Sequence, residues 1–148
     1  MLLFAWTTTT ALGQTETTPE TFAKAHKAHA KAELDYTAAI KREPDNANLY
    51  QQRGVVRFFQ LKFTESLADF DKFIEMMPSR EPYHWQRGLV HYYAGKYKAG
   101  RKQFESHQTV NTQDVENAVW HYLCISKIDG VKEAENQFIK ITSDRRVP

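Results

Sequence analysis

Histidines 26, 29, 84 and 91 are the side chains of this 148-residue sequence best suited to bind a metal or transfer protons. His26 and His29 lie one helical turn apart and could form half of a metal site. No third ligand stands near them, and a catalytic zinc ion needs at least three protein ligands. We therefore interpret this pair as part of a solvated helix face. His84 and His91 share one helix face but have no acidic partner, which favours a structural role over a site.

Cys124 is the only cysteine, and it could in principle act as a nucleophile. A reactive cysteine needs a basic partner and an exposed, electropositive setting. A free cysteine is more often a small buried hydrophobe, and we expect Cys124 to pack in this way. One cysteine also excludes an intramolecular disulfide framework and a cysteine-based zinc site. No catalytic triad, Gly-rich phosphate loop or metal set is recognisable, so the sequence predicts a protein without catalytic activity or cofactor.

The bulk composition is that of an ordinary globular domain, with 41% hydrophobic and 26% charged residues. The net charge of +2 is too small to indicate a nucleic-acid partner. No apolar stretch approaches the length of about 18 residues that would predict a membrane span.

Residues 1–18 differ from the remainder of the chain. The run Met1–Trp6 is apolar, and the small residues at Ala11–Gly13 suit a cleavage site. This composition predicts the tail of a secretory signal peptide followed by a polar linker, and thus a protein exported to a bacterial periplasm or cell envelope, or secreted. The alternative is a disordered apolar leader on a cytoplasmic protein.

The elements that must position these side chains repeat themselves with a constant period of 34. Arg53-Gly54 returns as Arg87-Gly88. The same spacing relates Pro44 to Pro78, Phe63 to Tyr97, and Phe70 to Phe104. A period of 34 is typical of helix-turn-helix repeats, in which one helix pair cannot bury its apolar stripe alone and pairs therefore stack.

One long helix over residues 19–43 is predicted to precede the repeats. Thr18 suits an N-cap, Pro19 the first helical position, and Glu20 the positive end of the helix dipole. Tyr36 lies one repeat period before Phe70. We therefore interpret this helix as the second half of an incomplete repeat that caps the solenoid at its N-terminal end.

Three repeats follow, within a single domain over residues 19–148. The first spans 47–78, with helices at about 47–60 and 64–77. The second spans 81–112, with helices at about 82–94 and 97–110. The third, over 114–142, is degenerate: Cys124 takes the small helix-contact position two residues late, and a helix at about 131–141 places Ala134, Phe138 and Ile141 in the core. No polar capping helix follows Ile141, so this end is a candidate for self-association.

This pattern resembles the tetratricopeptide repeat (TPR) family. The residues that carry the resemblance in the first repeat are Tyr50, Gly54, Phe63, Phe70 and Pro78, and in the second Gly88, Gly95, Tyr97, Gly100 and Phe104. The resemblance implies an all-α TPR helix-turn-helix solenoid of about three repeats preceded by one long N-terminal capping helix.

The resemblance also implies a concave groove lined by the first helix of each pair. Its groove positions fall mainly on apolar and aromatic residues, which are typical of peptide-binding hot spots. With the register of the third repeat shifted as above, Ile125 and Ile128 also face the groove. We expect Phe58 to fill space between neighbouring repeats, and Tyr93 is a second candidate for the same role. The candidate partner-binding residues are Gln51, Phe59, Trp85, Leu89, Tyr92, Tyr93 and His121.

Val55 and Leu89 stand where TPR modules that grip C-terminal carboxylates have polar groups, which argues against that kind of ligand. A narrower resemblance, carried by Arg87–Lys96 and Val119–Leu123, is to the NlpI-type TPR proteins of bacterial envelopes. It implies a dimeric adaptor for cell-wall hydrolases and an envelope protease. The sequence departs from that family in having no lipid-attachment cysteine after Gly13.

Three hypotheses of function follow. The first is a protein–protein adaptor or scaffold that binds a peptide or helical segment of another protein in the aromatic groove. The second is a structural module that forms a homodimer through its C-terminal repeat. The third, an enzyme or metal protein, requires the histidines to converge in space, which their positions in a solenoid disfavour.

Overall fold

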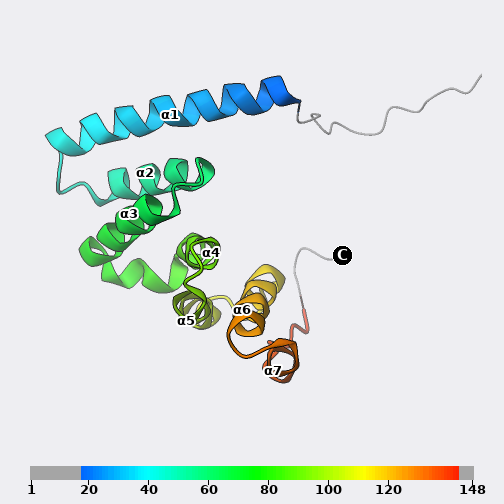
Figure 1. Cartoon of the computed structure of the whole chain (residues 1–148). Coiled ribbons are helices and arrows are strands. Elements are labelled where there is room, and N and C mark those ends of the chain that lie inside the picture. The colour runs from blue at the N-terminus through cyan, green and yellow to red at the C-terminus, as the bar shows by residue number, and fades with distance from the viewer. Residues whose placement is uncertain (1–17, 144–148) are drawn as a thin grey trace, which may run out of the picture.

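A computed structural model describes residues 18–143, and within this range the chain is all-helical. The helices stack in chain order (Figure 1), so the expected TPR-type solenoid is confirmed. The leader expected over residues 1–18 lies, except for Thr18, outside the described residues. The helices are α1 (Pro19–Arg42), α2 (Ala47–Phe59), α3 (Phe63–Met76), the 3-10 helix η1 (Pro78–Tyr83), α4 (Trp85–Tyr93), α5 (Tyr97–Gln108), α6 (Val115–Ile128) and α7 (Val131–Asn136).

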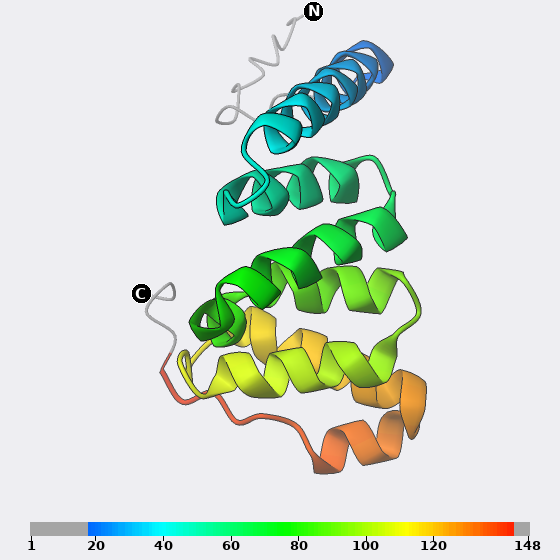
Figure 2. The same cartoon turned by 90° about the vertical axis from the view of Figure 1, so that its left-hand side faces the viewer.

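α1 begins as its sequence predicts. The hydroxyl of Thr18 accepts a hydrogen bond from the backbone N–H of Thr21 at 3.2 Å, and Pro19 occupies the first turn. The helix lies across the end of the stack, against α2 (Figures 1 and 2). None of its residues is fully buried. Its attachment to the repeats therefore depends strongly on polar contacts, which are described below.

The repeat period is visible in the packing of each helix pair. Gly54 of α2 lies against the ring of Phe70 in α3, and a Cβ atom built on Gly54 would come within 2.5 Å of that ring. Gly88 of α4 meets Phe104 of α5 in the same way, at 2.7 Å. Both rings are almost completely buried. The glycines are needed because only a residue without a side chain lets the aromatic ring approach the helix backbone so closely.

The second repeat begins differently from the expected helix at about 82–94. The chain forms η1 first, and α4 begins only at Trp85. Pro78 and Pro82 donate no backbone N–H group, which disfavours a continuous α-helix here. His84 then caps α4, because its ring nitrogen Nδ1 accepts a hydrogen bond from the backbone N–H of Arg87 at 3.2 Å.

The expected helix at about 131–141 is wrong in its length, since α7 ends at Asn136. Tyr122 stands one repeat period after Gly88, at the position where the earlier repeats have glycine. Phe138 corresponds to Phe104, but it packs edge-on against the Tyr122 ring, with 6.0 Å between centroids. Phe138 remains 46% exposed. The bulky ring at the glycine position prevents the close approach that would bury Phe138.

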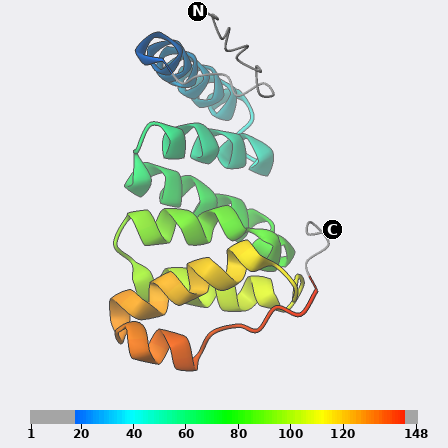
Figure 3. The ribbon, with the colours of Figure 1, turned by 90° about the vertical axis from the view of Figure 1, so that its right-hand side faces the viewer.

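After α7 the chain runs back across the end of the stack toward the start of α6 (Figures 2 and 3). The backbone N–H groups of Thr142 and Ser143 donate to Gln113 Oε1 at 2.9 and 3.0 Å. Ala134 is buried as expected, whereas Ile141 is only partly buried. Over residues 18–143, no helix is both long enough and apolar enough to cross a membrane.

Candidate functional site

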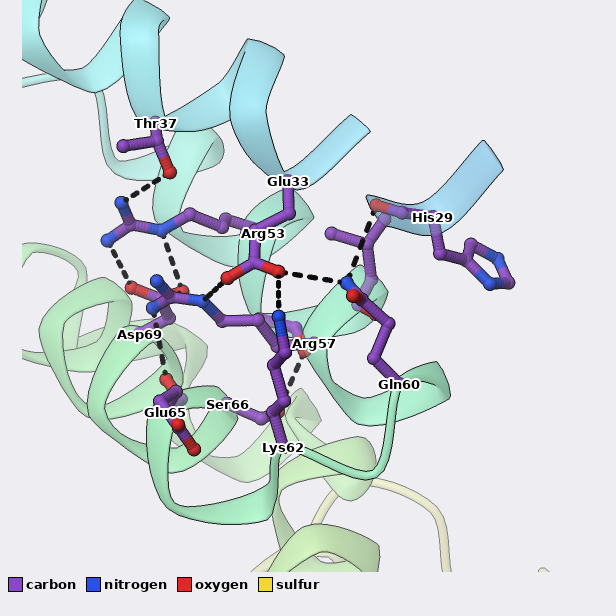
Figure 4. Close-up of polar contacts among 12 residues, drawn as sticks. His29, Glu33, Thr37, Arg53, Arg57, Gln60, Lys62, Glu65, Ser66 and Asp69 are labelled. Atoms are coloured by element: carbon purple, nitrogen blue, oxygen red, sulfur yellow. Dashed lines mark hydrogen bonds and ion pairs between the residues drawn. The ribbon is translucent and has the colours of Figure 1, made fainter. Parts of the chain in front are cut away.

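In each repeat, one side chain of the first helix makes a polar contact with a neighbouring helix. Side chains held in such contacts are not available to bind a partner. In the first repeat Arg53 donates to both carboxylate oxygens of Asp69 in α3, at 2.7 and 2.9 Å (Figure 4). It also donates to the hydroxyl of Thr37 in α1 at 3.2 Å. Arg57 and Lys62 both bind Glu33 of α1, at 2.9 and 2.5 Å. These contacts attach the capping helix to the first repeat.

The pKa of the Glu33 carboxyl shows how strongly this cluster favours the charged form. Burial acts to raise this pKa, but the hydrogen bonds from Lys62, Arg57 and Gln60 outweigh it and lower the pKa to about 2. The arginines are already bound to carboxylates of the same chain. We therefore interpret the cluster as structural.

The second repeat keeps both contacts of Arg53, and the third keeps only the contact to the preceding helix. Arg87 donates to Asp71 of the preceding helix at 2.7 Å and to Gln103 of its own pair at 2.9 Å. His121 stands one repeat period after Arg87 and lies 3.4 Å from Glu105 of the preceding helix. His121 is 5% exposed. The placement of His121 in the groove is therefore corrected: its side chain is turned into the stack, at the position of Arg53 and Arg87.

The expected shift of two residues in the third repeat is also wrong. Cys124 was expected at the small position, two residues late, but it stands one full period after Val90 and is buried like Val90. Its sulfur atom faces Gly100 of the preceding helix. Ile125 is also fully buried, so it is not a groove residue. The period of 34 continues without a shift, and Tyr122 occupies the small position.

Gln51 connects the first two repeats. Its Oε1 atom lies 2.5 Å from Nε2 of His84. Because Nδ1 of His84 accepts the hydrogen bond from Arg87, Nε2 must carry the proton and donate to Gln51. The ring also packs on Phe70, with 4.5 Å between centroids. Burial is the main cause that lowers the pKa of His84 to about 4, so the ring is neutral and structural at physiological pH.

His91 is likewise buried, and neither of its ring nitrogens has a hydrogen-bond partner within residues 18–143. Burial lowers its pKa to about 4. The two histidines therefore serve as packing groups between helices, as their spacing and lack of an acidic partner predicted. His29 instead stacks on Phe59, with 5.1 Å between ring centroids, while His26 is exposed.

An aromatic row joins the C-terminal ends of α2 and α4 to the middle of α6. Phe58 contacts Phe59 and Tyr93, with 5.7 and 5.8 Å between ring centroids. Tyr93 continues to Trp120 of α6 at 5.9 Å. Phe59 and Tyr93 are 58% and 50% exposed. We define the aromatic row as Phe58, Phe59, Phe63, Tyr92, Tyr93, Tyr97 and Trp120, which are linked by ring contacts.

Within the row, the exposed rings and the partly buried rings have different surroundings. Tyr92 is partly buried between Tyr97 and Trp120, with centroid distances of 5.4 and 5.2 Å. Phe58 packs against the buried core, as expected of a residue that fills space between repeats. Tyr93 stacks on Phe63 and still exposes half of its surface. Phe59 and Tyr93 are therefore the rings of this row that a partner could cover most extensively.

Trp85 stands apart from the row, between two surface hollows, and is 42% exposed. One hollow of about 160 Å³ has Trp85 and Trp120 on its wall. The other, of about 320 Å³, has a polar lining that includes Gln51 and Arg80. Leu89, the remaining candidate, lies partly buried on α4.

The sequence reasoning missed Trp120, which joins Tyr92 to Tyr93 and borders the first hollow. A strict repeat period would not have found it, because Trp120 takes the position of Gln86, which is not a candidate groove residue, and Val119 takes the position of Trp85. The assumed shift of two residues placed His121, rather than Val119, at the groove position of the third repeat.

The arrangement offers ring faces and amide groups for contact rather than reactive groups. Burial raises the pKa of the Cys124 thiol to about 12, so the thiol is protonated at neutral pH. Within residues 18–143, no three His, Cys, Asp or Glu side chains gather closely enough to hold a metal ion.

No protein-family profile matches the chain, but several curated proteins are similar to it, and two of them are described here. Over 90 residues, 61% of this chain, it is 26% identical to the protein SGT1 homolog of Bos taurus, of which the match covers 27%. Over 109 residues, 74% of this chain, it is 25% identical to the lipoprotein NlpI homolog of Haemophilus influenzae, of which the match covers 34%. The matches thus span only about a quarter to a third of these relatives.

The stacked helix pairs and the recurring cross-helix contacts define a helical-repeat protein with an exposed aromatic surface. The unbroken register of the repeats and the two similarities specify the class further: the chain is a TPR-type protein.

Proposed function

We propose that this protein is a non-catalytic adaptor that binds an extended or helical segment of another protein. The segment lies over Phe59 and Tyr93 of the aromatic row and anchors an apolar side chain beside Trp85. The observation that carries the proposal is the exposure of these three large rings on neighbouring repeats, at 58%, 50% and 42%. Exposed aromatic side chains are enriched at protein-binding hot spots, because they bury much area at little cost in side-chain entropy.

The proposal is tested by affinity capture from an extract of the source organism with the full chain as bait. The test variant is Trp85→Ala/Tyr93→Ala. The matched control is Phe22→Ala/Leu34→Ala, which removes two exposed apolar side chains of α1 outside the row. A partner that is bound by the wild type and the control, but lost by the test variant, supports the site. Helicity by circular dichroism must be equal in all three proteins.

Captured partners are then purified and titrated against the same variants. We expect a dissociation constant around micromolar, because one short segment buries less than a standard interface. Equal affinity of the wild type and Trp85→Ala/Tyr93→Ala for a purified partner would exclude the aromatic row as its site.

A second candidate function is self-association through the C-terminal end of the stack. The observation that favours it is the exposure of Val131 and Phe138 there, at 57% and 46%. Light scattering of the wild type at high concentration, beside Val131→Lys/Phe138→Lys, tests this candidate. A homodimer that the double variant dissociates supports it, whereas a monomeric wild type excludes it.

Export to the cell envelope is a further part of the proposal. It is supported by the signal-peptide-like composition of residues 1–18 and by the similarity to a lipoprotein homolog. Cell fractionation and N-terminal sequencing of the mature protein test it. Recovery of the intact chain from the cytoplasm would contradict it.

A further inference from the structure

A third hollow, of about 580 Å³, lies where the hairpin turn of the second repeat meets the end of α6. Its apolar part is formed by Tyr97, Ala99 and Ile128. Three lysines, Lys96, Lys98 and Lys127, also line it, and all three are exposed. We refer to it as the lysine hollow. It lies outside the two hollows that flank Trp85.

The three lysines have no ion-pair partner within residues 18–143, unlike Lys31, Lys62 and Lys72. Three ammonium groups around one hollow repel one another, and this repulsion weakens when an anion lies between them. The hollow is therefore complementary to a ligand that carries negative charge, provided that the ligand also offers apolar surface to Tyr97 and Ile128.

The first repeat shows which group a lysine at this turn binds. Lys62 stands one repeat period before Lys96, and its ammonium group lies 2.5 Å from the carboxylate of Glu33 in the preceding helix. In the second repeat, the position of Glu33 is taken by Leu67, which is buried in the core. The repeat thus keeps the lysine but lacks the carboxylate. The Lys96 ammonium group is therefore not held by a carboxylate of the preceding helix, as that of Lys62 is.

The lysine hollow continues the aromatic row. Tyr97 belongs to both, and its ring contacts Tyr92 with 5.4 Å between centroids. Lys127 stands one period after Tyr93 and two periods after Phe59, so the third repeat presents a cation where the first two present exposed rings. A segment that lies over Phe59 and Tyr93 would therefore meet positive charge when it reaches the third repeat.

We propose that the lysine hollow binds an acidic stretch of the partner's segment, in which carboxylates bind Lys96, Lys98 and Lys127 and an apolar side chain packs on Tyr97. This inference rests on the proposed adaptor function and deepens it, since it states the chemistry of one end of the segment. A protein ligand is favoured over an anionic membrane surface because the hollow is continuous with the aromatic row.

The test is selection of binding peptides from a displayed library of short random peptides against four full-length proteins. These are the wild type, Lys96→Glu/Lys98→Glu/Lys127→Glu, the matched control Lys24→Glu/Lys27→Glu/Lys41→Glu, and Trp85→Ala/Tyr93→Ala. The control reverses three exposed lysines of α1 that have no ion-pair partner in the described part of the chain, so both triple variants carry the same net charge.

We expect the wild type and the control to select peptides that join Asp or Glu residues to aromatic or aliphatic ones. The reversal of the three hollow lysines should abolish the enrichment of acidic residues but keep the apolar ones. A selected acidic peptide, measured by fluorescence anisotropy, should bind this variant at least about tenfold more weakly than the control. Its affinity for the wild type should fall as salt is raised.

Apolar peptides without acidic enrichment would overturn this inference and leave the adaptor proposal standing. Peptides that Trp85→Ala/Tyr93→Ala binds as tightly as the wild type would overturn the adaptor site. If the enrichment of acidic residues survives in that variant and is lost only when the hollow lysines are reversed, the lysine hollow is supported as a binding site and the Trp85/Tyr93 site is not. Selection of no peptide, with binding of anionic phosphatidylglycerol vesicles that depends on the three lysines, would identify a membrane contact and overturn the inference.

Discussion

Lowering the pH from 7 to 5 should destabilise this fold through His84 and His91. Burial lowers the pKa of both rings from 6.5 to about 4. Between these values the unfolded state binds protons that the folded state does not, so the free energy of unfolding falls as the pH falls. A pH of 5 is about 1.5 units below the pKa of the histidines in the unfolded chain, so these rings are almost fully protonated there. The folded rings remain mostly neutral at the same pH. Each histidine thus lowers the free energy of unfolding at pH 5 by about 2 kcal/mol, and the two together lower it by about 4 kcal/mol.

The assay is urea denaturation at pH 7 and pH 5, followed by circular dichroism and tryptophan fluorescence. With a slope of about 2 kcal/mol per molar urea, the midpoint should fall by about 2 M. Glu33 does not contribute in this range, because its folded pKa of about 2 keeps it ionised, and its stabilisation is lost only below pH 4.5. His121 also lowers the free energy of unfolding as the pH falls, because burial lowers the pKa of its ring as well.

The double variant His84→Asn/His91→Leu separates these histidines from other groups. Asparagine is neutral and is a favourable helix N-cap, and leucine replaces a ring whose nitrogens have no hydrogen-bond partner in the described part of the chain. Most of the pH dependence should disappear in this variant, but persist in the control His26→Asn, which changes an exposed ring. Identical wild-type midpoints at pH 7 and 5, or an unchanged loss in the double variant, would refute the reasoning.

Three further predictions concern packing, the attachment of α1 and the thiol. Gly88→Ala should lower stability by about 1–3 kcal/mol in thermal denaturation, because its Cβ would lie 2.7 Å from the Phe104 ring; an unchanged melting temperature would mean that the ring moves aside freely. Glu33→Gln should lower the free energy of unfolding by about 2–3 kcal/mol, because it leaves Arg57 without its carboxylate on α1. Backbone amide hydrogen exchange should become faster in α1 than in α5. An equal increase in both helices would contradict this. Cys124 should react with a thiol reagent only in urea, because it is fully buried with its pKa raised to about 12; rapid labelling of the native protein would show that α6 opens readily.

Much of the architecture could be predicted from the sequence because a repeat period constrains many positions at once. Gly54 and Phe70 recur as Gly88 and Phe104, and the structure brings each glycine against its ring. The caps at Thr18 and Asp114 were also predictable, because a side-chain oxygen before a helix satisfies free N–H groups within a few residues. Such local and periodic rules need no knowledge of distant contacts.

The candidate site could be predicted only in part, because exposure depends on neighbouring helices. The aromatic residues on the first helices were recognised, and the structure leaves Phe59, Trp85 and Tyr93 substantially exposed. Their role in binding remains a prediction. Trp120 was missed because it stands one residue after the position that corresponds to Trp85. His121 was placed on the wrong side because a shift of two residues in a helix turns a side chain by more than half a revolution.

The sequence by itself determined the helical stack, its period and the residues that form each pair, because the close approach of helices needs small residues at fixed intervals. Only the tertiary structure decided where the last repeat ends. Tyr122 at the glycine position keeps Phe138 from packing as Phe104 does, so α7 stops at Asn136 and the chain turns back. The tertiary structure alone also showed that Lys96 lacks the carboxylate that its counterpart Lys62 binds, because that contact joins residues far apart in the chain.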